Sequence, residues 1–290
     1  MQTSPLHPEF GLIVDNVDLR EVTADHLWPD IRQAFETHSA LLFRAQDFSD
    51  ETHLNIANLF GPLENRKAMA AGKELPFANS PVSNETKDGV TDAKALHTQN
   101  LQANMLWHTD STFLPIPALV NILTARVTPK SGGGQTELAS TRAGWATMPK
   151  YLKDVLQDAI IWHRLSNSRD RISPELGALP EMRQWPDRPW RALWTNPVTG
   201  KDALLIASHS FAIEGIGLKE GQAIIDEAIA HCTQPEHVYS HEWQVGDVLI
   251  WDERATVHRG QPWNYDEPRT LSSICCSVTE ADGLSSVRIV

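Results

Sequence analysis

Short apolar runs, separated by polar, glycine and proline residues, divide the first part of the chain into predicted elements. Residues 23–39 place apolar side chains at helical spacing, with Pro29 as a point where the helix breaks or restarts. Residues 40–43 are consecutive apolar residues and predict a strand. A second helix is predicted to start at an N-cap Ser49 and to end before Gly61-Pro62.

Residues 118–278 contain both helix-like and strand-like segments. Residues 141–158 have helical spacing in two pieces divided at Pro149, and residues 219–231 show a clearer helical pattern. Apolar strand patterns cover residues 118–127, 248–251 and 271–278. The order of these segments predicts a mainly β core with flanking helices.

Residues 65–104 interrupt this pattern. They are rich in Ala, Asn, Thr, Lys and Asp and show little periodicity. A long irregular segment inside a compact domain usually forms a functional lid or a mobile loop. We therefore predict an active-site lid over residues 65–104.

Length and composition are those of a globular protein. The 290 residues, 41% of them hydrophobic, are predicted to form a single domain over 1–290. No apolar run approaches the length of about 18 residues that a membrane span needs, and residues 1–7 lack the basic and apolar regions of a secretory signal. Cys275 and Cys276 are adjacent, which disfavours a disulfide between them. We expect a cytoplasmic protein with reduced thiols and no membrane partner.

The net charge of −12 argues against a nucleic-acid partner, because no segment supplies the basic stripe that backbone binding requires. It does not exclude a small anionic substrate. A few buried cations bind a small acid whatever the net charge.

Two histidines and an aspartate are the candidate metal ligands. His108 and Asp110 are two residues apart, so on a strand both side chains would point to the same face. His258 follows far downstream, shortly after Trp251-Asp252. Two imidazoles and one carboxylate suit a non-haem Fe(II), because three ligands on one side leave the other side open for substrate and O₂. This set predicts an iron oxygenase.

Further motifs accompany these candidate ligands along nearly the whole chain. They are Phe60-Gly61-Pro62-Leu63-Glu64, residues 107–113, Gly132-Gly133-Gly134-Gln135-Thr136-Glu137, His163 with Asn167-Ser168-Arg169, Ile206-x-x-His209 with Glu214-Gly215, and residues 246–269. Together they resemble the TauD/TfdA family, the taurine and phenoxyacetate dioxygenases that depend on Fe(II) and 2-oxoglutarate. The Leu63-Glu64 pair and the Asn-Ser-Arg run favour the phenoxyacetate branch.

The resemblance implies a cofactor site and a fold. His108, Asp110 and His258 would be the iron ligands, and Thr136 and Arg269 would bind the distal carboxylate of 2-oxoglutarate. The chemistry agrees, because a guanidinium offers a planar fork of donors to a carboxylate and a hydroxyl adds one more. The implied fold is a double-stranded β-helix, a cupin-like jelly roll, with the site between two sheets.

From the residues alone, other interpretations of these two contacts stay open. Arg269 could form a surface ion pair with Asp266 or Glu267. Thr136 could be a turn residue after the three glycines, which we interpret as a tight turn rather than a phosphate loop.

The implied reaction is hydroxylation of a small organic acid by O₂, coupled to decarboxylation of 2-oxoglutarate to succinate and CO₂. For an aryloxyalkanoate, hydroxylation beside the ether oxygen would lead to ether cleavage. Where relatives carry a substrate-contacting arginine four residues after the 2-oxoglutarate arginine, this chain has Ser273. We therefore predict that Arg66 or Lys67 contacts the substrate anion; the alternative is that both are solvated loop charges.

Alternative functions also stay open. The same chemistry could act on a sulfonate, a sulfate ester or an N-acyl amino acid, and a non-catalytic β-helix protein that binds a metal or a small acid is the alternative from another class. His231, Cys232, His237 and His241 cluster in sequence, but their spacing matches no usual zinc pattern and favours a solvated helix end. We expect a homo-oligomer.

Overall fold

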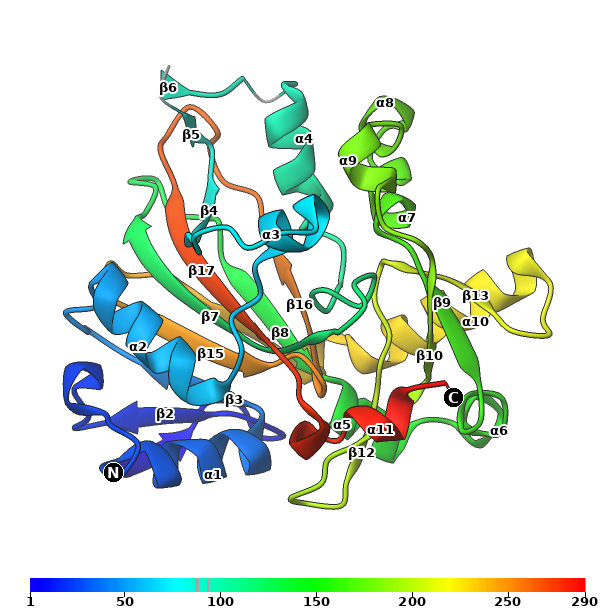
Figure 1. Ribbon diagram of the computed structural model, residues 1–290, viewed down its shortest axis with the longest axis horizontal. Helices are drawn as coiled ribbons and strands as arrows, with labels where there is room; N and C mark the ends of the chain where they lie inside the picture. Colours follow the sequence, from blue (N-terminus) through cyan, green and yellow to red (C-terminus); the bar gives the residue numbers. More distant parts are fainter. Residues whose placement is uncertain (87–88, 93, 290) are drawn as a thin grey trace.

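A seven-stranded sheet is the largest element of the computed structural model, which describes residues 1–86, 89–92 and 94–289 (Figure 1). Its described strands are antiparallel apart from one parallel pair, β2 and β3. In spatial order they are β1 (Gln2–Pro5), β2 (Leu12–Asp15), β3 (Ala40–Phe43), β15 (Val248–Asp252), β7 (Ala118–Val127), β17 (Thr270–Ser277) and β4 (Ser80–Ser83).

Smaller sheets complete the β structure. The sheet nearest to the functional site consists of β14 (Val238–His241), β8 (Thr136–Ser140) and β16 (Thr256–Gly260). The others are β10 (Arg188–Arg191) with β9 (Ile160–His163) and β13 (Ser210–Ile213), β11 (Leu193–Thr195) with β12 (Asp202–Leu204), and β5 (Glu85–Thr86) with β6 (Gly89–Val90).

Helices flank the sheets, and α1 and α2 pack against one face of the large sheet (Figure 1). The α-helices are α1 (Trp28–His38), α2 (Asp50–Phe60), α3 (Arg66–Ala71), α4 (Leu96–Ala103), α5 (Thr141–Thr147), α6 (Lys150–Leu156), α7 (Leu165–Asp170), α8 (Pro174–Gly177), α9 (Pro180–Arg183), α10 (Leu218–Cys232) and α11 (Leu284–Val287). Short 3-10 turns lie at Leu19–Glu21, Pro235–His237 and Glu280–Asp282. The predicted class, mainly β with flanking helices, is confirmed.

Strand β7 shows how the large sheet separates the core from the site. Side chains alternate between the two faces of a strand, and both faces of β7 are covered, so its sequence is apolar nearly throughout. Ile122 packs in the core beneath α1 and α2, whereas Leu123 packs in a second core with Leu138 of β8. Asn121, on the same face as Leu123, lines the cavity described below.

Most predicted elements are confirmed, and their local causes are visible. The hydroxyl of Ser49 accepts a hydrogen bond from the Thr52 amide at 3.1 Å and so caps α2. Pro149 separates α5 from α6 as expected. The first helix begins at Trp28 rather than near Thr23, because Pro29 fits the first turn of a helix and not its interior.

The prediction that residues 65–104 lack regular structure is wrong in part. Residues 87, 88 and 93 lie outside the described residues, but the remainder contains α3, β4, the β5–β6 hairpin and α4. Helix α3 is capped by Asn65, whose side chain accepts a hydrogen bond from the Ala68 amide, and β4 pairs with β17. Capping and tertiary pairing fix these short elements, which are too brief to show a hydrophobic period.

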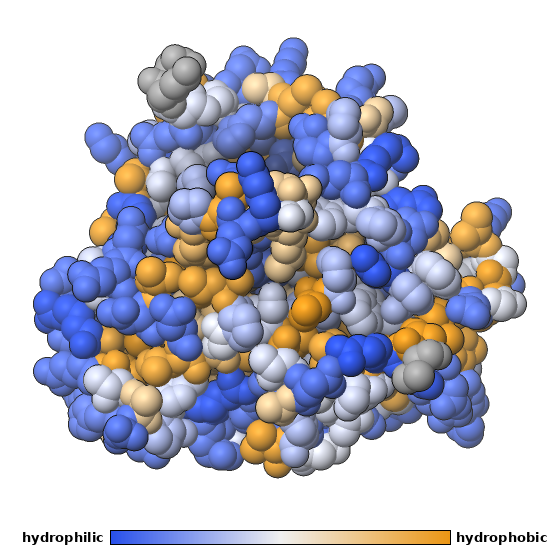
Figure 2. All heavy atoms as spheres, viewed as in Figure 1, coloured by the Kyte–Doolittle hydropathy of each residue, from blue (hydrophilic) through white to orange (hydrophobic). Residues whose placement is uncertain are grey.

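No helix in the described part of the chain is long and apolar enough to cross a membrane. On the face in Figure 2, hydrophobic residues form patches separated by hydrophilic ones.

Candidate metal centre and its cavity

The candidate site residues lie around a cavity of about 480 Å³ between the large sheet and the β14–β8–β16 sheet. Strands of both sheets and helices α3, α4 and α7 supply the lining. The lining includes every residue predicted for the site: Arg66, Lys67, His108, Asp110, Thr136, His258 and Arg269.

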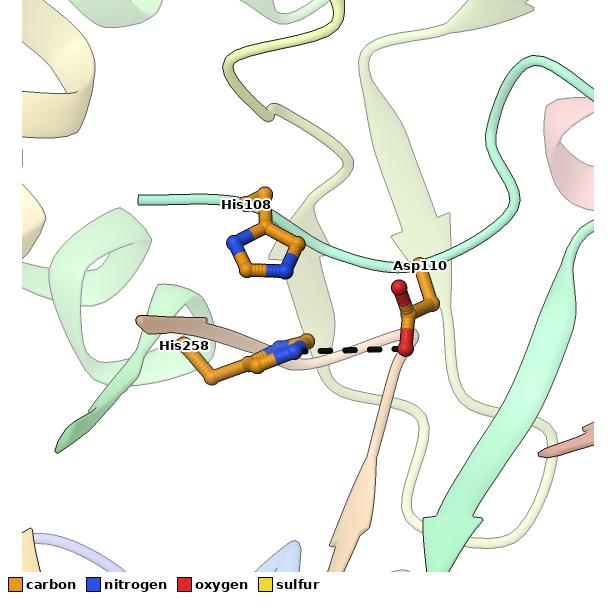
Figure 3. A group of neighbouring side chains, drawn as sticks. All are labelled: His108, Asp110 and His258. Atoms are coloured by element: carbon orange, nitrogen blue, oxygen red, sulfur yellow. Dashed lines mark ion pairs between the residues drawn. The ribbon is translucent and has the colours of Figure 1, made fainter. Parts of the chain in front are cut away.

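The three predicted ligands belong to the lining of this cavity, and their side chains lie close together (Figure 3). One potential ligand atom from each of His108, Asp110 and His258 can be chosen so that all lie within 4.8 Å of one another. Nε2 of His258 is 3.9 Å from Oδ2 of Asp110, and the two imidazole centroids are 4.1 Å apart. Two imidazoles and one carboxylate at this spacing fit a facial site for a divalent metal such as Fe(II).

The prediction that His108 and Asp110 lie on one strand is wrong. His108 forms an isolated bridge to His258: the His258 amide donates to the His108 carbonyl at 2.7 Å, and the His108 amide donates to the His258 carbonyl at 2.9 Å. The chain then turns at Ser111, which has a positive φ of 64°. Backbone pairing to β16 therefore brings the ligands together, rather than strand alternation.

Hydrogen bonds on the far side of the ligands orient them. Nδ1 of His108 lies 2.7 Å from the carbonyl oxygen of Leu106, which leaves Nε2 free to bind a metal. Asn121 donates to Oδ2 of Asp110 at 2.8 Å, and Ser273 donates to the Asn121 amide oxygen at 2.9 Å. Ser273, which replaces the expected substrate arginine, thus supports a metal ligand.

Glu253 is a buried carboxyl group behind the site that sequence reasoning missed. It accepts hydrogen bonds from the Thr109 hydroxyl at 2.6 Å, the Asp110 amide at 2.8 Å and the Trp251 indole at 2.7 Å. Its Oε2 lies 3.8 Å from Nδ1 of His258. Glu253 directly follows Trp251-Asp252 in the sequence, but only the tertiary structure shows that its side chain lies next to His258.

Burial and neighbouring charges shift the pKa values of the site. Burial lowers the pKa of His258 to about 3, and it also lowers the pKa of His108. Burial alone would raise the pKa of Asp110, but the charges of His258, Arg66 and His108 hold it below its usual range. Neutral imidazoles and an ionised carboxylate are the protonation states that bind a metal.

Arg269 and Thr136 are buried, with exposed fractions of 4% each. Arg269 donates from Nη2 to the Gly134 carbonyl at 2.6 Å and forms no ion pair among the described residues, so the surface pair with Asp266 or Glu267 is excluded. Thr136 begins β8, and the Trp243 indole donates to its hydroxyl oxygen at 3.0 Å. The Thr136 hydroxyl proton is therefore available to a ligand.

Arg66 is the first residue of α3, and its side chain is 44% exposed but contacts two residues of the site. Its Nε is 2.5 Å from Oε1 of Glu64, and its Nη2 donates to Ser111 at 2.9 Å. Lys67 is exposed at the cavity wall. Arg169, at the end of α7, also lines the cavity; the sequence marked it only as part of the Asn-Ser-Arg run.

The cluster formed by His231, Cys232, His237 and His241 does not assemble into a second metal centre within the described chain. Cys232 is buried, His231 lies beside the Thr147 hydroxyl, and His237 pairs with Glu9. Helix α10 does end at Cys232, but the prediction of a solvated helix end is wrong for Cys232 and His241, which are both buried.

Comparison with known protein families identifies the family of this chain. The model of the TauD, TfdA family, described as taurine catabolism dioxygenase, matches residues 2–275. The chain belongs to this family. The comparison confirms the resemblance in the sequence, and the family fixes the reaction class as that of 2-oxoglutarate-dependent dioxygenases, which use Fe(II).

Several relatives of this TauD, TfdA family member are phenoxyacetate or phenoxypropionate dioxygenases. A 2,4-dichlorophenoxyacetate dioxygenase of Cupriavidus pinatubonensis is 33% identical over 92% of this chain and 94% of its own. A phenoxypropionate dioxygenase of Sphingobium herbicidovorans is 30% identical over 92% of both. A crystal structure of AAD-2 with Mn(II) and N-oxalylglycine superposes with a TM-score of 0.88 at 30% identity, covering 97% of this chain and 99% of AAD-2.

Proposed function

We propose that this dioxygenase hydroxylates a small aryloxyalkanoic acid next to its ether oxygen, which leads to cleavage of the ether. The main support for this proposal is the set of residues that line one cavity. It combines the metal-ligand triad, the buried Arg269 guanidinium, the buried Thr136 hydroxyl and an apolar wall. The relatives that act on phenoxyacetate and phenoxypropionate support the same substrate class.

His108, Asp110 and His258 are proposed to hold the iron from one side. The iron would supply activation of O₂ and oxidation of a C–H bond, coupled to decarboxylation of 2-oxoglutarate to succinate and CO₂. The chain contributes neutral imidazoles, an ionised carboxylate and the hydrogen bond from Asn121 that orients the carboxylate.

Arg269 and Thr136 are proposed to bind the distal carboxylate of 2-oxoglutarate. Burial lowers the pKa of Arg269 to about 10, so the guanidinium remains protonated at neutral pH. Its charge has no anionic partner in the described chain, and a carboxylate would supply one.

An apolar wall would receive the aromatic ring of the substrate. It includes Phe77, Leu101, Met105, Phe113 and Leu271. Arg66 and Lys67 line the same cavity and stay candidates for contact with the substrate anion. A cavity with both apolar and cationic walls suits an acid that carries an aromatic ring.

We also propose a double-stranded β-helix formed by the large sheet and the β14–β8–β16 sheet, within a single domain over 1–290. Residues 65–104 would close over the substrate as a lid, since α3 and α4 both line the cavity. A homo-oligomer in the cytoplasm remains a prediction from the sequence.

The proposed function is tested by succinate release under air from iron-loaded protein and 2-oxoglutarate, with and without candidate acids. Aryloxyalkanoates are expected to raise succinate release and to yield the corresponding phenol. Stimulation by sulfonates, sulfate esters or N-acyl amino acids alone would assign another substrate. Absence of succinate with and without every acid would support a non-catalytic binding protein.

A further inference from the structure

Some of the charged side chains that line the cavity have an ion-pair partner, and others do not. Among the described residues, Arg66 is paired with Glu64, and Arg259 is paired with Glu137 at 2.6 Å. Asp110 belongs to the metal triad. Three cations in the lining, Lys67, Arg169 and Arg269, form no ion pair with a described residue.

These three cations differ in their surroundings. Lys67 is exposed, and an exposed ammonium is strongly hydrated and adds little to binding. Arg269 is buried and Arg169 is partly buried, and burial lowers the pKa of each to about 10, so both stay charged at neutral pH. A desolvated guanidinium without an anionic partner is costly, which indicates that each receives an anion from a ligand.

The two arginines serve different parts of the cavity. Arg269 lies against Gly134, in the turn before β8. Arg169 lies at the end of α7, where its Nε donates to Asn100 of α4 at 3.2 Å and its Nη1 donates to Ser168 at 2.8 Å. Its Nη2 has no hydrogen-bond partner in the described chain and is not sealed from the cavity.

Arg169 also lies close to the metal ligand His108. The imidazole of His209 lies between the two, with its ring centroid 6.2 Å from that of His108. Ser168, which positions the Arg169 guanidinium, also lies 3.0 Å from Nδ1 of His209. Two hydrogen bonds thus hold the guanidinium while one edge stays free.

We propose that Arg169 binds the carboxylate of the substrate acid, in place of the arginine that Ser273 replaces. This inference rests on the proposed function and names its specificity residue. With Arg269 assigned to 2-oxoglutarate, Arg169 is the remaining desolvated cation that a second carboxylate can neutralise. Arg66, whose charge Glu64 already matches, has a secondary role.

The test measures binding without turnover. Phenoxyacetate and its uncharged amide are titrated into the protein loaded with Fe(II) and 2-oxoglutarate in the absence of O₂. Arg169→Ala is expected to weaken phenoxyacetate binding about 30-fold or more, because it removes one partner of a desolvated charge pair. Amide binding and 2-oxoglutarate affinity are expected to change less than about 3-fold.

Two further variants make the result specific. Arg169→Lys keeps the charge without the planar fork and is expected to retain part of the preference for the acid over the amide. Arg171→Ala is the matched control, because Arg171 is exposed, pairs with Asp226 and lies outside the lining. This control is expected to bind phenoxyacetate like the wild type.

The outcomes separate this inference from the proposed function. Equal affinity of wild type and Arg169→Ala for phenoxyacetate, or an equal loss for acid and amide, would overturn the role of Arg169. If Arg169→Ala does not fold, the acid-to-amide preference of Arg169→Lys decides, and an unchanged preference would overturn it. If binding depends on the charge of Arg169 but no aryloxyalkanoate causes succinate release, the role of Arg169 in binding the carboxylate is supported and the proposed reaction is rejected.

Discussion

At the scale of single residues, each of the three proposed metal ligands is expected to be necessary for metal binding. His108→Ala or Asp110→Ala is expected to abolish binding of Fe(II), because two remaining donors hold a labile divalent ion too weakly. Metal content after desalting, measured by elemental analysis, checks the expectation, and circular dichroism confirms that the variants fold. Stoichiometric iron in both variants would refute the assignment of the site.

Substitutions of Arg269 and Thr136 are expected to weaken the binding of 2-oxoglutarate by different amounts. Arg269→Ala should raise the 2-oxoglutarate KM by an amount equivalent to about 2–5 kcal/mol, because a desolvated charge pair is lost. Thr136→Ala should cost about 1 kcal/mol, the contribution of one hydrogen bond. The measurement is succinate formation against 2-oxoglutarate concentration, and equal small effects would place the carboxylate elsewhere.

At the scale of elements, the turn between β7 and β8 positions Arg269, which we propose binds 2-oxoglutarate. Gly134 has a φ of +68°, and an added Cβ would lie 2.5 Å from Nε of Arg269. Gly134→Ala is therefore expected to displace the guanidinium and to raise the 2-oxoglutarate KM about 10-fold or more.

Gly132→Ala is the matched control for this turn. Gly132 has a φ of +80°, but an added Cβ would have no heavy atom within 4 Å. The variant bears the same kind of backbone strain without touching Arg269. It is expected to lose stability while keeping the wild-type KM, whereas an equal rise in KM for both variants would show that backbone strain alone is responsible.

At the scale of the whole molecule, buried neutral histidines make stability depend on pH. Burial lowers the pKa of His163 to about 3 and that of His53 to about 4. Between these values and the ordinary pKa of about 6.5, the unfolded chain binds a proton that the folded chain does not. The free energy of unfolding is therefore expected to fall as pH decreases from 6.5 to 5, by about 1 kcal/mol per pH unit for each such histidine.

Urea unfolding of the metal-free protein at several pH values measures this slope. His163→Gln is expected to reduce the slope between pH 5 and 6.5 by about 1 kcal/mol per pH unit, whatever its effect on stability at pH 7. Glu253, whose pKa burial raises, acts in the opposite direction in both proteins and cancels in the comparison. An unchanged slope in the variant would contradict the buried neutral state of His163.

The sequence by itself determined the elements whose causes are local. The Ser49 cap, the division at Pro149 and the apolar run of β7 follow from capping, backbone restriction and burial on both faces. The motifs around His108 and His258 also determined the family and the residues to examine, because ligand chemistry restricts which side chains serve an iron site.

Only the tertiary structure decided how these residues work together. The bridge between His108 and His258, the support of Asp110 by Asn121 and Ser273, and the unmatched charge of Arg169 join segments far apart in the sequence. Short elements such as α3 and β4 likewise depend on caps and partner strands rather than on a period of their own. The physical reason is that hydrogen bonding, desolvation and charge pairing depend on distance in space, which a linear pattern does not specify.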